Sequence, residues 1–197
     1  MEGYIREVLA KYGHPMPKKR QISPHKHSNI VYGAKQQFTP DKYTSPNLDL
    51  AGIWCVQGIV GALLYYACVV DNKLIMDIND IGIHQAATTE CTAASINQLL
   101  GYVVTYPNYC IIFRASDMIM CRHSDTAYIN SSKACSLSVS FILLLEYDPI
   151  PRLIGPVLTL SQIIKFLMSS ADEAEMEGLF ITSKNMIPLR QNLIEMS

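Results

Sequence analysis

Two carboxylates in the C-terminal half of the chain have surroundings that could support chemistry. Glu175 belongs to the stretch SSADEAEMEGLF, residues 169–180, which places four acids within six positions. Asp125 ends the segment MIMCRHSD, residues 118–125, whose composition predicts a strand. Carboxylate oxygens are ligands that Mg²⁺ prefers, so one acid from a strand and one from a helix would begin a magnesium site.

The acidic stretch itself predicts the start of a helix. Ser170 and Glu173 have the spacing of a capping box, in which a serine hydroxyl and a glutamate satisfy free backbone donors. Asp172 lies in the first turn, where the helix dipole favours a negative charge. Neither acid therefore needs a catalytic role.

Glu175 differs from its neighbours in the face that it occupies. A helical wheel sets it on a side of small and apolar residues, which are Ala171, Ala174, Gly178 and Leu179. Glu173 and Glu177 share the opposite side, and we expect both to be solvated. A carboxylate on an apolar side costs free energy unless it is paired or holds a metal. Glu175 is therefore the functional candidate, and an ion pair with a basic residue is the alternative.

Asp125 also has two interpretations. Near the end of a strand it could present its carboxylate to a neighbouring helix. It could equally cap a turn before Thr126. Two acids alone bring less negative charge than an active two-metal phosphodiester site needs.

The composition is that of an ordinary globular chain. Its 197 residues are 49% hydrophobic and include 16 basic and 17 acidic residues, for a net charge of −1. This balance excludes a whole-chain basic field, so any nucleic-acid role needs a local site. Six cysteines without a CxxC pair indicate reduced thiols, and no signal peptide is recognisable. We therefore expect an intracellular protein, cytoplasmic or nuclear. PKKR at 17–20 is a minimal nuclear-import cluster or a solvated stretch.

Helical patterns dominate the first half. Apolar spacing predicts a helix over 4–12, and five prolines predict an extended, poorly packed connection over 14–52. Further helices are expected over 53–70 and 91–105, with a helix or turn at 74–84. Residues 53–70 contain no charge, and 18 residues is about the minimum for a membrane span. The lack of flanking basic residues favours a buried helix, and a membrane helix is the alternative.

Strand patterns follow. Composition and turn signals predict strands over 109–115, 118–125, 136–147 and 157–162, before the acidic helix. We therefore expect an α/β fold.

Other side chains that could bind metals form no clear set. His25 and His27 lie in the proline-rich connection, where they could contribute to a metal site or be solvated. Cys121 and His123 would share one strand face, but no second pair stands at zinc spacing. Asp117 is expected in a turn between two strands.

The residues around the two carboxylates resemble a known family. The segments HSDTAY, SSKACS and LMSSADEAEMEGLF resemble the ribonuclease H domain of copia-type long-terminal-repeat retrotransposon polyproteins. Upstream, GYIREVLAKYG, VYGAKQQF and VQGIVGALLYYACVVD are similar to the end of the reverse transcriptase and the connection that follows it. The resemblance spans nearly the whole chain.

This resemblance implies a division into three parts. Residues 109–197 would form a partial ribonuclease H-like mixed sheet with a helix. A helical connection region over 53–108 would precede it, after a reverse-transcriptase remnant and linker over 1–52. The resemblance also implies that Asp125 and Glu175 are catalytic metal ligands for Mg²⁺ or Mn²⁺. The partner would be an RNA–DNA hybrid, whose RNA strand is hydrolysed, or the rest of a retroelement polyprotein, with no membrane involved.

The chain also departs from the family's pattern. The family carries a third aspartate on a later strand, and nothing before the last residues, NLIEMS, corresponds to it. Cys135 replaces an arginine, and Val139 and Ser140 stand where glycines are expected. We therefore expect a fragment that has lost its hydrolytic activity. The alternatives are a non-catalytic binding or assembly module and a small membrane-associated protein that uses residues 53–70.

Overall fold

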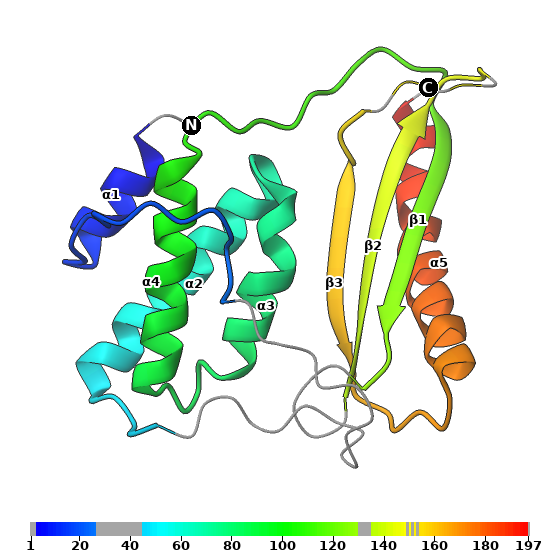
Figure 1. Cartoon of the computed structure of the whole chain (residues 1–197). Helices are drawn as coiled ribbons and strands as arrows, with labels where there is room; N and C mark the ends of the chain where they lie inside the picture. Colours follow the sequence, from blue (N-terminus) through cyan, green and yellow to red (C-terminus); the bar gives the residue numbers. More distant parts are fainter. Residues whose placement is uncertain are drawn as a thin grey trace. The chain divides into compact units, whose positions relative to one another are not determined.

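A computed structural model describes residues 3–26, 45–129, 135–148, 150, 152 and 154–196 (Figure 1). The described residues up to Cys110 form one compact unit, and those from Ile111 onward form a second. Unit 1 is helical, whereas unit 2 combines a sheet with one long helix. The described chain is therefore α/β, which confirms the predicted fold class.

Unit 1 is built around α2 (Leu50–Val69). Asp49 caps this helix by accepting a hydrogen bond from the Gly52 N–H at 2.8 Å, so the helix begins earlier than the predicted residue 53. The buried residues of α2 are all apolar or aromatic: Val56, Ile59, Val60, Leu63, Tyr66 and Ala67. They form a single core cluster with residues of the other helices of the unit.

The first helix, α1 (Tyr4–Lys11), packs on α2 where Gly58 leaves room. A Cβ at Gly58 would overlap the Tyr12 ring, so the ring lies directly against the α2 backbone. The Tyr4 hydroxyl also donates a hydrogen bond to the Ala62 carbonyl at 3.2 Å. The predicted helix over 4–12 is confirmed, and it shares the core of α2.

Two further helices complete unit 1. A short 3₁₀ turn, η1 (Asn72–Leu74), leads into α3 (Ile75–Ile83). The segment 74–84, which was predicted to be either a helix or a turn, is therefore mainly a helix. The next helix is α4 (Glu90–Thr105), as predicted. Thr89 and Thr92 form a capping box at its start, each hydroxyl accepting a hydrogen bond from the other's backbone N–H.

Residues 14–26 contain no helix or strand, yet hydrogen bonds attach them to α4. The Gln21 N–H donates to Thr105 Oγ1 at 3.1 Å, and the Gln98 side chain donates to the Ser23 carbonyl at 2.9 Å. Gly101 permits this approach, because a Cβ there would lie 2.7 Å from Gln21 Cγ. The prediction of a poorly packed connection is therefore wrong here, since hydrogen bonds replace the missing secondary structure. Residues 27–44, including His27, lie outside the described residues.

Unit 2 contains three described strands, which pair in the order β1–β2–β3. They are β1 (Ile119–Ala127), β2 (Ser136–Leu145) and β3 (Leu158–Ile164). Both pairings are antiparallel, with Asp125 opposite Val139 and Thr126 opposite Ser138. Three of the predicted strands are confirmed. The described sheet is wholly antiparallel, which differs from the predicted mixed sheet.

The segment 109–115 was also expected to be a strand, and it is not. Among the described residues, one backbone hydrogen bond joins it to the chain after β2, from the Gly155 N–H to the Ile112 carbonyl at 2.7 Å, and the Ile111 side chain lies against Gly155. A strand needs a ladder of such bonds. The apolar content of the segment therefore indicated a partly packed connection rather than a strand.

The last helix, α5 (Ala171–Met196), packs along β1 and β2 (Figure 1). Its buried residues are Ala174, Gly178 and Thr182, spaced one turn apart. Small residues at this spacing allow the helix axis to lie close to the sheet.

Among the described residues, α2 is the one helix that is long and apolar enough to cross a membrane, judged by length and composition. Its inner side is packed in the core of unit 1, as the buried-helix prediction requires. Only 33% of its most apolar 18-residue stretch is buried, so the described part of the chain leaves much of the outer side exposed.

Gly58 and Gly61 form a matched pair for testing the packing of α1 on α2. Gly58→Ala forces a methyl group against Tyr12, so we expect the free energy of unfolding to fall by about 1–3 kcal/mol. Gly61→Ala meets open space and replaces a poor helix former, so we expect a gain of about 0.5–1 kcal/mol. Urea denaturation in dilute solution, followed by circular dichroism, measures both. Equal losses at the two sites would contradict this packing.

Candidate functional site

Helix α5 brings the Glu175 side chain to β1. Its Oε1 atom accepts a hydrogen bond from the Thr126 N–H at 3.3 Å. Thr126 directly follows Asp125, so the structure brings the helix glutamate to the strand at the position after the predicted aspartate. Glu175 thereby satisfies a backbone donor of the strand.

Gly178 determines how closely α5 approaches the sheet. A Cβ at this position would overlap Thr126 Oγ1 and lie 2.9 Å from Ser138 Oγ. The two hydroxyl side chains therefore face α5 and occupy the space that a larger residue would need. Glu175 lies less than one turn away, so its reach to the strand depends on this contact.

Arg122 fastens the same helix one turn further along. Its Nη1 atom donates to the Leu179 carbonyl at 3.0 Å and to Ser183 Oγ at 2.7 Å. Arg122 and Thr126 are four residues apart on β1, so both side chains project from the face that α5 covers. Sequence reasoning did not single out Arg122, because its strand position alone gives no sign of a helix partner.

Asp125 lies on the other face of the strand. Successive residues of a strand alternate between the two faces, and Thr126 faces α5. Asp125 therefore projects away from α5, and its side chain is exposed. The structure thus brings Glu175 to the backbone beside Asp125 without placing the two carboxylates on the same side of the sheet.

Glu175 does not lie on the buried side of α5, and that prediction was wrong. The residue is exposed, as are Ala171 and Leu179, which were expected to share a packed side with it. The helix packs instead through the side centred on Gly178. Glu173 is exposed as predicted, whereas Glu177 is partly buried. A wheel locates an apolar side only roughly when small residues, rather than large ones, make the contact.

The predicted cap at the start of α5 is confirmed, with one difference. Ser170 Oγ accepts a hydrogen bond from the Glu173 N–H at 3.1 Å. The Glu173 carboxylate accepts from the Ser169 hydroxyl at 2.6 Å and from the Ser169 N–H at 2.7 Å, one residue before the expected donor. These two hydrogen bonds lower the pKa of the Glu173 carboxyl. Glu173 therefore has a structural role.

The residues present do not fit a two-metal hydrolytic centre. In the described part of the chain, no three His, Cys, Asp or Glu side chains gather where they could hold a metal. Asp125 and Glu175 project on different sides of β1, and one Glu175 oxygen already accepts a backbone hydrogen bond. Two-metal catalysis needs several acids that converge on ions about 3.5–4 Å apart.

The remaining predicted side chains have ordinary positions. Asp117 Oδ2 accepts a hydrogen bond from the Tyr147 N–H at 2.7 Å, so the acid lies before β1 and joins it to the end of β2. Cys121 and His123 share a strand face, as expected from their spacing. Most of SSKACS lies outside the described residues.

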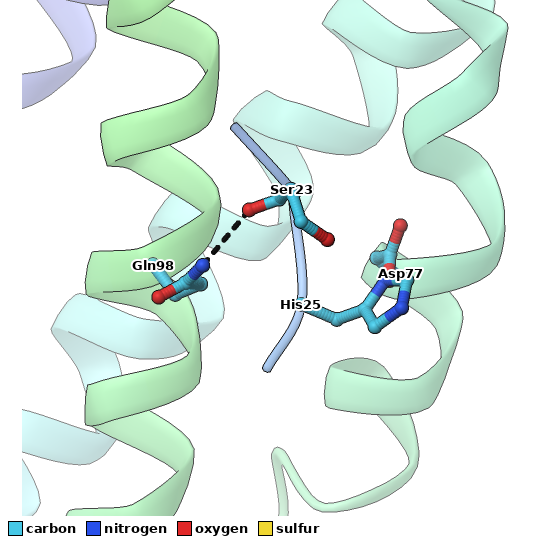
Figure 2. Close-up of polar contacts among 4 residues, drawn as sticks. All are labelled: Ser23, His25, Asp77 and Gln98. Carbon is cyan, nitrogen blue, oxygen red and sulfur yellow. Dashed lines mark hydrogen bonds and ion pairs between the residues drawn. The ribbon is translucent and has the colours of Figure 1, made fainter. Parts of the chain in front are cut away.

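A second polar cluster, in unit 1, joins the segment 19–26 to α3 and α4 (Figure 2). His25 Nδ1 lies 2.9 Å from Asp77 Oδ1 on α3, beside the contact between Ser23 and Gln98. The Asp77 side chain is only 17% exposed, and burial raises the pKa of its carboxyl, partly offset by His25. Sequence reasoning considered His25 as a metal ligand or a solvated residue. The sequence signal that could have indicated its partner is Asp77, an acid that lies among the isoleucines of α3.

Asp71 is a second buried acid of unit 1. Its side chain is almost wholly buried, and its Oδ1 accepts a hydrogen bond from the Lys73 N–H at 3.3 Å. Burial raises the pKa of this carboxyl, while the charge of Lys73 opposes the rise. The Lys73 ammonium lies 3.8 Å from the centre of the Tyr109 ring. These groups fix the turn after α2 and form no recognisable reaction site.

Comparisons of the chain with models of protein families, with curated proteins and with solved structures find no match. The resemblance to copia-type ribonuclease H domains therefore stays a prediction.

Asp71 and Asp77 give unit 1 an unusual dependence on pH. A carboxyl whose pKa is raised by folding stabilises the folded state below its unfolded pKa, and this contribution is lost as the pH rises through the folded pKa. Asp71→Asn keeps an acceptor for the Lys73 N–H and removes the buried charge. We expect the variant to gain stability relative to the native chain as the pH rises above the ordinary pKa of aspartate, about 4. Urea denaturation of the dilute chain at several pH values, followed by the circular dichroism of the helices, measures this. Parallel pH profiles would contradict the assignment.

Gly178→Ala tests whether the close approach of α5 positions Glu175. The added methyl group must push α5 away from Thr126, so we expect unit 2 to lose about 1–3 kcal/mol of stability. We also expect faster hydrogen exchange at the Thr126 amide, because its bond to Glu175 lengthens. Glu175→Ala, which leaves the helix packing intact, should speed exchange at Thr126 with a smaller loss of stability. Unchanged exchange in both variants would contradict the contact.

Proposed function

We propose that unit 2 derives from the ribonuclease H domain of a copia-type retroelement polyprotein, and that it engages an RNA–DNA hybrid without hydrolysing the RNA. The contact between Glu175 and Thr126 carries the proposal. It joins residues 49 positions apart at the two segments, HSDTAY and SSADEAEMEGLF, on which the resemblance rests. This hydrogen bond brings the two segments together in one domain, which supports their derivation from a single ribonuclease H domain.

The lack of hydrolysis follows from the placement of the acids. Asp125 and Glu175 project on different sides of β1 and provide less charge than a two-metal site needs. No metal-dependent step is therefore assigned to them. In this chain Glu175 holds a strand amide, and Asp125 is an exposed acid.

Binding to the hybrid would depend on shape rather than on charge. Residues 111–197 include nine acidic and seven basic residues, so long-range attraction to phosphates is weak. Contacts to the backbone and to 2′-hydroxyl groups are the features by which proteins distinguish a hybrid from a DNA duplex.

Exposed apolar side chains on α5 favour a second candidate function, assembly with a protein partner. They project from one side of the helix, at spacings of four and seven residues: Met176, Phe180, Ile187 and Ile194. Contiguous exposed apolar surface of this kind marks protein interaction sites.

The test uses the purified chain and a labelled RNA–DNA hybrid in Mg²⁺ or Mn²⁺. We expect no RNA cleavage above that of Asp125→Asn, a variant of an exposed residue that leaves folding intact. We also expect tighter binding to the hybrid than to a DNA duplex of the same sequence. RNA cleavage by the native chain that is absent in Asp125→Asn would contradict the proposal that the chain has lost hydrolytic activity. Equal or absent binding to the two duplexes would overturn hybrid recognition and leave assembly as the function.

A further inference from the structure

We propose that the outer side of α2 is a surface through which two copies of this chain associate. The proposal concerns unit 1 and does not rest on the function proposed for unit 2. The outer side carries large exposed apolar residues along the whole helix: Leu50, Trp54, Leu64, Tyr65 and Val69. None of the 20 residues of α2 is charged, so two such helices meet no like-charge repulsion.

Gly61 lies in the middle of this outer side and is exposed. A Cβ there would meet nothing within 4 Å, so nothing in the described part of the chain requires a glycine. Gly58, by contrast, is explained by the Tyr12 ring. A glycine inside a helix costs about 0.5–1 kcal/mol relative to alanine. Close packing of a second helix against Gly61 would explain why a glycine stands there, because small residues let two helix backbones approach closely.

An antiparallel pair that crosses at Gly61 is self-complementary. The two-fold axis sets Trp54 of one copy opposite Cys68 of the other, so a large side chain meets a small one. It also sets Gln57 opposite Tyr65. The Gln57 Nε2 atom already donates to the Gln85 carbonyl at 3.1 Å, which leaves its amide oxygen to accept a hydrogen bond from the Tyr65 hydroxyl of the second copy. Opposed helix dipoles further favour this orientation.

A second copy fits this surface better than a lipid bilayer does. The inner side of α2, including Ile59 and Leu63, is fixed in the core of unit 1, so lipid cannot surround the helix. No cluster of basic residues flanks the helix: Asp49 precedes it, and beyond its end the exposed Lys73 lies beside the buried Asp71. Anionic membrane surfaces attract segments with the opposite charge.

The size of the surface predicts a reversible dimer. A helix of 20 residues is about 30 Å long. Two helices in contact over that length bury on the order of 1,000 Å², which is near the lower limit for a specific interface. We therefore expect a dissociation constant in the micromolar range.

Trp54 reports the association directly, because it is the only tryptophan of the chain and is 73% exposed. The experiment dilutes the full chain through the micromolar range and records sedimentation and tryptophan emission together. We expect a monomer–dimer equilibrium, with emission that shifts to longer wavelength on dilution as Trp54 enters water. A monomer at every concentration, with constant emission, would overturn the proposal.

Gly61→Ala and Gly82→Ala separate the interface from the fold. Both replace a helical glycine without a steric clash, since the nearest atom to a Cβ at Gly82 is Val60 Cγ1 at 3.9 Å. We expect Gly61→Ala to raise the dissociation constant about tenfold, while the diluted monomer becomes more stable. Gly82→Ala lies on α3 and should leave the dissociation constant unchanged. Equal effects of the two substitutions on association would overturn the role of Gly61.

The orientation of the pair is tested by cross-linking. With a mild thiol oxidant such as diamide, Trp54→Cys should form an intermolecular disulfide with Cys68. The cross-link should disappear when Cys68→Ser is added. A cross-link that persists would overturn the antiparallel arrangement. Flotation of monomeric chain with vesicles containing anionic lipid would overturn the choice of a second copy and identify a membrane surface instead.

Discussion

Both units depend on three glycines at which a side chain of a neighbouring segment lies directly against the helix backbone. Gly58 lets the Tyr12 ring rest on α2, Gly101 admits the segment around Gln21 to α4, and Gly178 seats α5 against the sheet. At each site a Cβ would fall within 3 Å of a neighbouring side chain, so the side chain or the element that carries it would have to shift. The Gly178 contact also decides the candidate site, because the reach of Glu175 to β1 depends on it.

The two units reach stability by different means. Unit 1 buries a large apolar cluster from four helices, whereas unit 2 has a smaller buried cluster of Ile164, Met168 and Ala174, besides the buried β2 residues Ile142 and Leu144. Hydroxyl groups fill much of the space between α5 and β2, and Thr126 Oγ1 is buried without a hydrogen-bond partner. A buried polar atom without a partner costs about 1–3 kcal/mol. Small and hydroxyl side chains therefore take part in the contact between α5 and the sheet, whereas large apolar side chains form the core of unit 1.

The sequence predicts the elements well and their contacts poorly. Apolar patterns located α1, α2 and α4, the capping-box spacing located the start of α5, and three strands followed from composition, because these signals are local. The segment 109–115 has the composition of a strand but pairs with none of the described strands, and only the tertiary structure decides such pairing. The wheel of α5 misjudged Glu175 because glycine and alanine make the contact. The sequence singled out Asp125 and Glu175 as candidate residues. It did not show that Asp125 projects from the face of β1 opposite to α5, because that depends on how β1 is oriented in the sheet.

The positions of the acids also limit how a hybrid can approach unit 2. The beginning of α5 carries four acids within six residues, and Glu173 and Glu175 are exposed there. Phosphates that approached this side would meet several negative charges at once. The opposite face of β1 presents Asp125 and the exposed His123, which is a smaller negative charge. Under the proposed function, we therefore expect the hybrid to approach the face of β1 that α5 leaves free, where it would lie near Asp125.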